Sequence, residues 1–133
     1  MNDTTATGTI ESKSWEQTEF ASADGAPALG VATGHDRYSG DIVGDAEWRG
    51  ITYSAADGSG GFDSLQRMHC TLAGRAGTFV LRMTGTFDAT GDSRADWSVL
   101  PGSGTGDLTG LTGTGGYDST DGANTYRLTY RFT

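Results

Sequence analysis

Strict alternation of apolar and polar residues is the feature that most constrains the fold of this chain. It is clearest over residues 124–133, where Tyr126, Leu128, Tyr130 and Phe132 alternate with threonines and arginines. The same period of two recurs along most of the sequence, and helical periodicity is nearly absent. Successive side chains of a β-strand point to opposite faces, so each such segment predicts a strand with one buried face.

About eight segments of this kind follow one another, separated by turns that contain glycine. The chain has 22 glycines and two prolines in 133 residues, which favours tight turns between short strands. The apolar face of the last segment needs a covering neighbour, and no segment resembles an edge strand blunted by lysine or proline. We therefore predict an all-β fold, a single domain over residues 1–133 that forms a small, closed, antiparallel barrel of eight strands with little helix. The expected strands are residues 7–15, 31–38, 41–53, 62–72, 79–87, 94–100, 112–119 and 124–133, with one short helical turn at 107–111.

The alternation also predicts which side chains point into the barrel. Over residues 62–72, one set of alternate positions is less charged than the other, and we assign that set to the interior. Over residues 79–87, Val80 belongs to the outward set. The facing of residues 31–38, which include His35, stays open. The residues predicted to point inward are Phe62, Ser64, Gln66, Met68, Cys70, Leu72, Phe79, Leu81, Met83, Phe87, Trp97, Val99, Tyr126, Leu128, Tyr130 and Phe132.

Charge and targeting signals limit the expected partners and location. The net charge is −8, so nucleic acid and anionic membrane surfaces would be repelled. The N-terminus lacks the basic and apolar stretches of a signal peptide, and no apolar run is long enough to span a membrane. With Cys70 as the only cysteine, no intrachain disulfide can form. We expect a cytoplasmic protein.

The sequence has no signature of a metal site or a cofactor site. His35 and His69 are far apart and match no zinc-ligand spacing. The glycine-rich stretch 101–110 lacks the lysine of a P-loop, and no βαβ unit accompanies it. We expect these glycines to let the chain cross one end of the barrel. A buried and inert thiol is the expected state of Cys70.

Short motifs spread along nearly the whole chain carry a family resemblance. They lie at residues 6–9, 13–15, 38–42, 72–81, 97–108 and 126–130. Together they resemble DUF3224, a bacterial family of unknown function, and the run Pro-Gly-Ser-Gly-Thr-Gly from Pro101 is the most distinctive of them. That family resembles the allene oxide cyclase-like barrels, small eight-stranded barrels that include dirigent proteins and bacterial polyketide cyclases. The resemblance implies a barrel with an apolar cavity, and it implies no single reaction.

The chain departs from this family pattern at two inward positions. Where relatives tend to have Glu-Arg on the fourth strand, this sequence has Gln66 followed by Arg67. Where they often have histidine on the fifth strand, it has Met83. If relatives use an acid or a base at these positions, this protein lacks that group.

The aromatic and polar interior suggests a function inside the barrel. An eight-stranded barrel either fills itself or holds one small ligand, and buried hydroxyl, indole and amide groups need partners. Our first hypothesis is a cofactor-independent cyclase or isomerase that acts on a small, apolar natural-product intermediate. The expected catalytic residues are Tyr130, Gln66 and Tyr126. The expected substrate-binding residues are Trp97, Met83, Met68, Phe62, Phe79 and Cys70.

Two alternatives stay open at the level of sequence. One is a barrel that binds a small apolar ligand without changing it. The other is a filled barrel whose outer surface mediates protein association, including a homo-oligomer.

Overall fold

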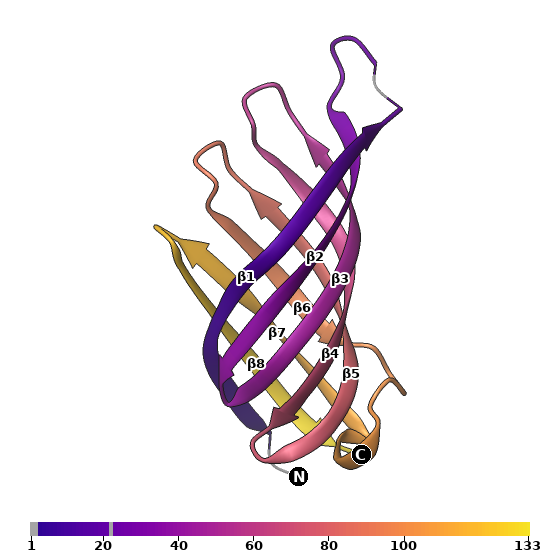
Figure 1. Cartoon of the computed structure of the whole chain (residues 1–133), viewed down its shortest axis with the longest axis vertical. Helices are drawn as coiled ribbons and strands as arrows, with labels where there is room; N and C mark the ends of the chain where they lie inside the picture. Colours follow the sequence, from indigo (N-terminus) through magenta and orange to yellow (C-terminus); the bar gives the residue numbers. More distant parts are fainter. Residues whose placement is uncertain (1–2, 22) are drawn as a thin grey trace.

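Figure 1 shows the computed structural model of the chain, which describes residues 3–21 and 23–133. Long antiparallel strands and one short 3-10 helix, η1, make up the secondary structure of these residues. In chain order the elements are β1 Thr4–Phe20, β2 Ala28–Gly40, β3 Ile42–Ser54, β4 Gly60–Leu72, β5 Arg75–Phe87, β6 Ser93–Val99, η1 Gly106–Leu108, β7 Leu111–Thr120 and β8 Ala123–Phe132.

The strands form a closed barrel in which each strand pairs with the next one along the chain and β8 pairs with β1. The upper end in Figure 1 carries the hairpin loops that follow β1, β3, β5 and β7, and the lower end carries both termini. The predicted closed antiparallel barrel of eight strands with little helix is thus confirmed. Most strands extend further than predicted, and β1 extends furthest beyond its predicted end.

β1 closes the barrel only over its first part. Residues 4–9 pair with β8, whereas pairing with β2 continues to Phe20. Beyond residue 9, one edge of β1 therefore has no strand partner among the described residues. Proteins guard such edges with lysine, charge and bulges, and this edge has a bulge between Ser12 and Ser14 and carries Lys13, the only lysine of the chain. The segment is not rich in lysine or proline, as expected, but its outer half is unpaired on one side in the described part of the chain, which the sequence did not predict.

The glycine-rich loop after β6 closes the lower end of the barrel. β6 is shorter than β5, and the loop backbone takes its place beside the first half of β5: the Thr105 N–H donates to the Thr78 carbonyl at 2.9 Å. Leu108 of η1 is fully buried in the hydrophobic core. The predicted crossing of one barrel end is confirmed, and the helical turn expected at 107–111 is the 3-10 helix at 106–108.

The same loop explains one exception to the alternation on β5. Val80 points outward, as predicted, yet it is only 6% exposed. Its N–H donates to the Ser103 hydroxyl at 3.0 Å, and its carbonyl accepts from the Leu100 N–H at 2.8 Å. The loop covers this outer position, so burial there does not mark the inner face.

The predicted inward register is confirmed on the strands where it was assigned. Gln66 is 1% exposed and Tyr130 is 7% exposed, whereas Leu65, on the opposite face of β4, is 51% exposed. A register error of one residue would have exchanged these faces.

Candidate functional site

The upper half of the barrel holds a cavity of about 510 Å³ that is open to solvent on one side. Sites for small molecules usually lie in the range of about 300–1,000 Å³, so the cavity has room for one small ligand. Its described lining combines apolar and aromatic side chains with a few polar groups. The lining residues are Ile10, Ser12, Trp15, Gln17, Ala32, Asp36, Tyr38, Trp48, Gly50, Thr52, Phe62, Ser64, Gln66, Met83, Phe87, Gly91, Ser93, Tyr117 and Asn124.

Asp36 on β2 is the most unusual member of this lining. It shares the inner face of β2 with Tyr38 and lies opposite Ser12 of β1. Burial raises the pKa of the Asp36 carboxyl to about 6, although the indole N–H of Trp48 and the charge of His35 oppose the rise. A carboxyl with this pKa gains and loses a proton near neutral pH, as general acids and bases must.

Gly34 explains how Trp48 reaches this carboxyl. The two residues face each other across the β2–β3 pair, and a Cβ at position 34 would lie 2.5 Å from Trp48 Nε1, Cε2 and Cζ2. The indole therefore lies across the bare glycine backbone, with Asp36 two residues further along β2. A larger residue at position 34 would displace the ring.

Tyr38 and Gln66 form a buried polar pair beside Asp36. Gln66 Nε2 donates to Tyr38 Oη at 2.9 Å, which leaves the Tyr38 hydroxyl hydrogen free for another acceptor. Burial raises the pKa of Tyr38 well above its usual value, and the charge of Asp36 adds to the rise. Tyr38 therefore stays protonated at neutral pH and can donate a hydrogen bond into the cavity. Gln66, predicted as catalytic, holds this tyrosine.

Two more polar groups lie on the β6–β8 side of the cavity. The Ser93 hydroxyl donates to Tyr117 Oη at 3.3 Å, and burial raises the pKa of Tyr117, with the charge of Asp36 contributing. Asn124 Oδ1 is buried and has no hydrogen-bond partner among the described residues. A buried acceptor without a partner is costly, so Asn124 is suited to a ligand or water.

An aromatic layer lies beneath the cavity. Trp97 stacks on Tyr126, with ring centroids 5.9 Å apart and an interplanar angle of 23°, and Tyr38 packs against both rings. Trp97 is 2% exposed, and its indole N–H has no partner among the described residues. This layer separates the upper cavity from the aliphatic core below.

The Tyr126 hydroxyl forms hydrogen bonds with two backbone groups. It accepts from the Ile42 N–H and donates to the Ser39 carbonyl, both at 2.9 Å, and so it ties β8 to the turn between β2 and β3. A Cβ on Gly8 would lie 2.5 Å from the same Oη. This geometry gives Tyr126 a structural role and leaves its hydroxyl no free hydrogen for a substrate.

We expect Tyr126→Phe to lower the free energy of unfolding by about 1–3 kcal/mol, because it leaves the buried Ile42 N–H without an acceptor. Tyr130→Phe is the matched control, since it removes a hydroxyl from the same strand and the same face. Urea unfolding of the two variants measures the difference. Equal losses would contradict the structural role of Tyr126.

The structure brings some of the predicted site residues together and separates others. Gln66, Met83 and Phe62 line the upper cavity. Of the four residues predicted to share a pocket, Gln66 and Met83 are in this lining, whereas Trp97 and Tyr130 are not. The predicted site residues that lie outside this lining are Tyr130, Tyr126, Trp97, Met68, Phe79 and Cys70.

These six residues belong to the packed interior below the cavity. Met68 and Phe79 face each other across the β4–β5 pair and are fully buried. Tyr130 packs edge to face on Phe132, with centroids 6.0 Å apart. Burial raises the pKa of the Cys70 thiol to about 11, so it stays protonated at neutral pH and is a poor nucleophile.

The sequence interpretation did not select Asp36, although a signal for it exists. Residues 32, 34, 36 and 38 of β2 are Ala, Gly, Asp and Tyr, and the intervening positions include His35 and Arg37. If Tyr38 is assigned to the interior, Asp36 follows it there. A lone carboxyl on a face otherwise made of small and aromatic residues is the signal that could have found the site.

A second hollow, of about 540 Å³, lies on the outer surface over β5 to β8. Its walls carry arginines and aspartates together with threonines, and its floor is the glycine-rich middle of β7. Its charged residues are all exposed, whereas Asp36 of the inner cavity is partly buried. The inner cavity is therefore the candidate site.

Comparison with known proteins agrees with this fold. The sequence profile of the family described as "Protein of unknown function (DUF3224)" matches residues 6–130. The chain belongs to the DUF3224 family. A crystal structure of a DUF3224 protein of unknown function from Shewanella oneidensis MR-1 is similar to it, with a TM-score of 0.81 and 26% identity over 99% of both chains. No curated protein matches this DUF3224 chain.

Two further observations describe this DUF3224 protein. Within residues 3–21 and 23–133, no helix is long and apolar enough to cross a membrane. The same residues contain no group of three or more His, Cys, Asp or Glu side chains that could hold a metal ion.

Proposed function

We propose that this protein is a cofactor-independent isomerase or cyclase that holds a small, mostly apolar molecule in the upper cavity and moves a proton on it through Asp36. One observation carries the proposal: a single carboxyl with a pKa of about 6 lines a cavity that is otherwise aromatic and uncharged. Acid–base groups with a pKa near the working pH are the most efficient.

The neighbouring side chains are arranged to assist such a step. Tyr38 is two residues from Asp36 on the same face of β2, about 6–7 Å along the strand. A small molecule between them meets the carboxyl at one end and the tyrosine hydroxyl at the other. Because Gln66 donates to the oxygen of Tyr38, that hydroxyl becomes a stronger donor to developing charge.

The resemblance of the sequence to allene oxide cyclase-like barrels is consistent with the proposal, since it implies a barrel with an apolar cavity. Under this proposal the substrate is a natural-product intermediate and the expected compartment is the cytoplasm. Tyr130 and Tyr126, the tyrosines first selected from sequence, have structural roles: Tyr130 packs on Phe132, and Tyr126 bonds to the backbone. Binding without reaction remains the alternative, and the following experiment separates the two.

The base capacity of Asp36 can be measured with 5-nitrobenzisoxazole, a small aromatic probe. A base removes its ring C–H proton, the N–O bond breaks, and a coloured cyanophenolate forms. We expect turnover that rises with pH through about 6, where Asp36 ionises. Asp36→Asn should lower it by about a hundredfold or more, within the range of general-base catalysis.

Tyr130→Phe is the control, because Tyr130 lies outside the cavity lining and its loss should leave turnover unchanged. Equal turnover in the wild type and Asp36→Asn would refute a proton-transferring role. If the probe quenches tryptophan fluorescence in the cavity but does not react, the protein is a binding protein.

A further inference from the structure

Asp36 is the only charged residue among the described residues that line the upper cavity. When it is ionised, no lysine, arginine or histidine of this lining balances its charge. An uncompensated charge in an apolar site is unfavourable. The cavity therefore favours a guest that brings a positive charge.

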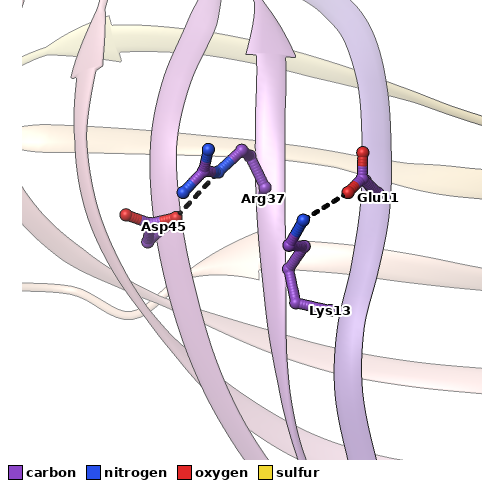
Figure 2. Close-up of polar contacts among 4 residues, drawn as sticks. All are labelled: Glu11, Lys13, Arg37 and Asp45. Carbon is purple, nitrogen blue, oxygen red and sulfur yellow. Dashed lines mark hydrogen bonds and ion pairs between the residues drawn. The ribbon is translucent and has the colours of Figure 1, made fainter.

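Lys13 of β1 and Arg37 of β2 form ion pairs with carboxylates other than Asp36. Figure 2 shows that Arg37 reaches Asp45 of β3, with Nε 3.2 Å from Oδ1. Lys13 reaches Glu11, with Nζ 2.6 Å from Oε1. All four side chains lie at the exposed surface of the barrel. Since both cations pair with other carboxylates, a counter-ion for Asp36 would have to come from a molecule inside the cavity.

The aromatic lining points to the same kind of guest. The rings of Tyr38, Trp48, Phe62, Phe87 and Tyr117 line the cavity. Aromatic faces attract cations, and a desolvated ammonium beside several rings is held more strongly than an exposed one. The net charge of −8 also draws cations toward the protein and repels anions.

We infer that the upper cavity binds a small molecule with a positively charged nitrogen on an apolar body, an amine or an iminium ion. The inference names the substrate class for the proposed function and rests on that function only for the proton-transfer step. Under this inference a neutral molecule of the same shape binds more weakly, and a carboxylate is repelled.

Proton transfer on an iminium ion fits this cavity. The C–H bond beside C=N⁺ breaks, and its proton goes to the Asp36 carboxylate. The electron pair of that bond forms C=C, and the π pair of C=N⁺ moves to nitrogen, which gives a neutral enamine. Where a second C=C is conjugated with the enamine, return of the proton to the terminal carbon of that C=C shifts the double bond and re-forms C=N⁺. This gives an isomer of the iminium ion and restores the carboxylate. A carboxylate and a cation become two neutral groups, and an apolar site favours that change. Proton removal from a neutral substrate gives an anion that no cation of the described lining stabilises, so it is slower unless the product is a stable anion, as the phenolate from 5-nitrobenzisoxazole is.

The pH dependence of binding depends on the groups around Asp36. Tyr38 on its own strand and Tyr117 on β7 stay protonated, because burial raises the pKa of both. Ser12 of β1 and Trp48 of β3 do not ionise in this range. His35 is adjacent in sequence, and its side chain lies on the outer surface beside Glu47. Asp36 is therefore the group whose ionisation controls cation binding above and below pH 6.

The test compares two probes of the same shape, benzyltrimethylammonium and its neutral carbon isostere neopentylbenzene. Quenching of tryptophan fluorescence reports binding, because Trp15 and Trp48 line the cavity. At pH 8 we expect the ammonium to bind about tenfold more tightly than the isostere, the effect of one charge-assisted contact of about 1.4 kcal/mol. The preference should fall in Asp36→Asn to the part that the aromatic rings alone supply, and it should decrease in the wild type at pH 5.

Equal binding of the two probes at pH 8, or tighter binding of the anion phenylacetate, would overturn the inference. So would an ammonium preference that is as large in Asp36→Asn as in the wild type. If the probes bind equally while Asp36 still drives turnover of 5-nitrobenzisoxazole, the proposed function stands and the substrate class is wrong. If the ammonium binds selectively and no turnover occurs, the substrate class stands and the catalytic role fails.

Discussion

Asp36→Asn is expected to stabilise the protein at pH 8 by about 2 kcal/mol, a figure reduced for the solvent screening of a partly exposed group, since it removes a charge whose pKa burial raises to about 6. The asparagine side chain has nearly the same shape and still offers an oxygen to the Trp48 indole N–H. The substitution should abolish proton transfer at the same time. A change that improves stability while it removes activity is typical of a functional residue in a strained environment.

The sign of the pH dependence follows from the direction of the shift. The folded protein holds the Asp36 proton up to pH about 6, whereas an unfolded aspartate releases it near 3.8. Between these values the folded state binds more protons, so the contribution of Asp36 to stability falls as pH rises. The advantage of Asp36→Asn should therefore be absent at pH 3, grow between pH 4 and 7, and stay constant above that.

Urea unfolding of both proteins at several pH values gives this difference directly. Other carboxyls contribute in the opposite direction, because hydrogen bonds from neighbouring side chains lower the pKa of Glu11, Asp57 and Asp88. These groups are present in both proteins and cancel in the difference. A variant that is less stable than the wild type at pH 8, or a gain that does not depend on pH, would contradict the raised pKa of Asp36.

The alternation of side chains was sufficient to predict the barrel because it reports which face of each strand meets the core. It could not predict burial that is caused by a loop lying on the outer face of a strand. Val80 is buried from outside by the loop after β6, and no periodicity within β5 contains that information. The length of β1 was missed for a related reason. Residues 11–20 are exposed on both faces, so they carry no apolar pattern even though they pair with β2.

The candidate site was predicted only in part because polar roles depend on partners distant in sequence. The inner position of Gln66 follows from β4 alone, and it was predicted. The role of Tyr126 depends on the backbone of Ser39 and Ile42, which are 87 and 84 residues away. Whether Asp36 points into the barrel depends on which face of β2 is buried, and the sequence did not determine that face. A tyrosine on an apolar face is equally compatible with catalysis and with a structural hydrogen bond until its partners are known.

The second large effect is expected at the opposite end of the barrel. Leu108→Ala should lower the free energy of unfolding by about 2–5 kcal/mol, the usual cost of truncating a fully buried leucine. Leu108 is 0% exposed and belongs to the same core cluster as Leu72, Phe79 and Leu111. The loop that carries it is held to β5 by backbone and side-chain hydrogen bonds, so the loop is poorly placed to collapse into the space left by the side chain.

Leu65→Ala is the matched control, because Leu65 is 51% exposed on the outer face of β4 and should change stability by less than about 0.5 kcal/mol. Urea unfolding compares the two leucine variants. Leu108 is not among the residues that line the upper cavity, so Leu108→Ala should bind the ammonium probe as the wild type does while it remains folded. Asp36→Asn should show the reverse, with higher stability at pH 8 and a reduced ammonium preference. The two substitutions lie at opposite ends of the barrel and should have opposite effects. If so, the residues that stabilise the fold are separate from those that bind the ligand. The alternative is that the cavity and the lower core behave as one cooperative unit. Weakened ammonium binding in folded Leu108→Ala would favour this alternative.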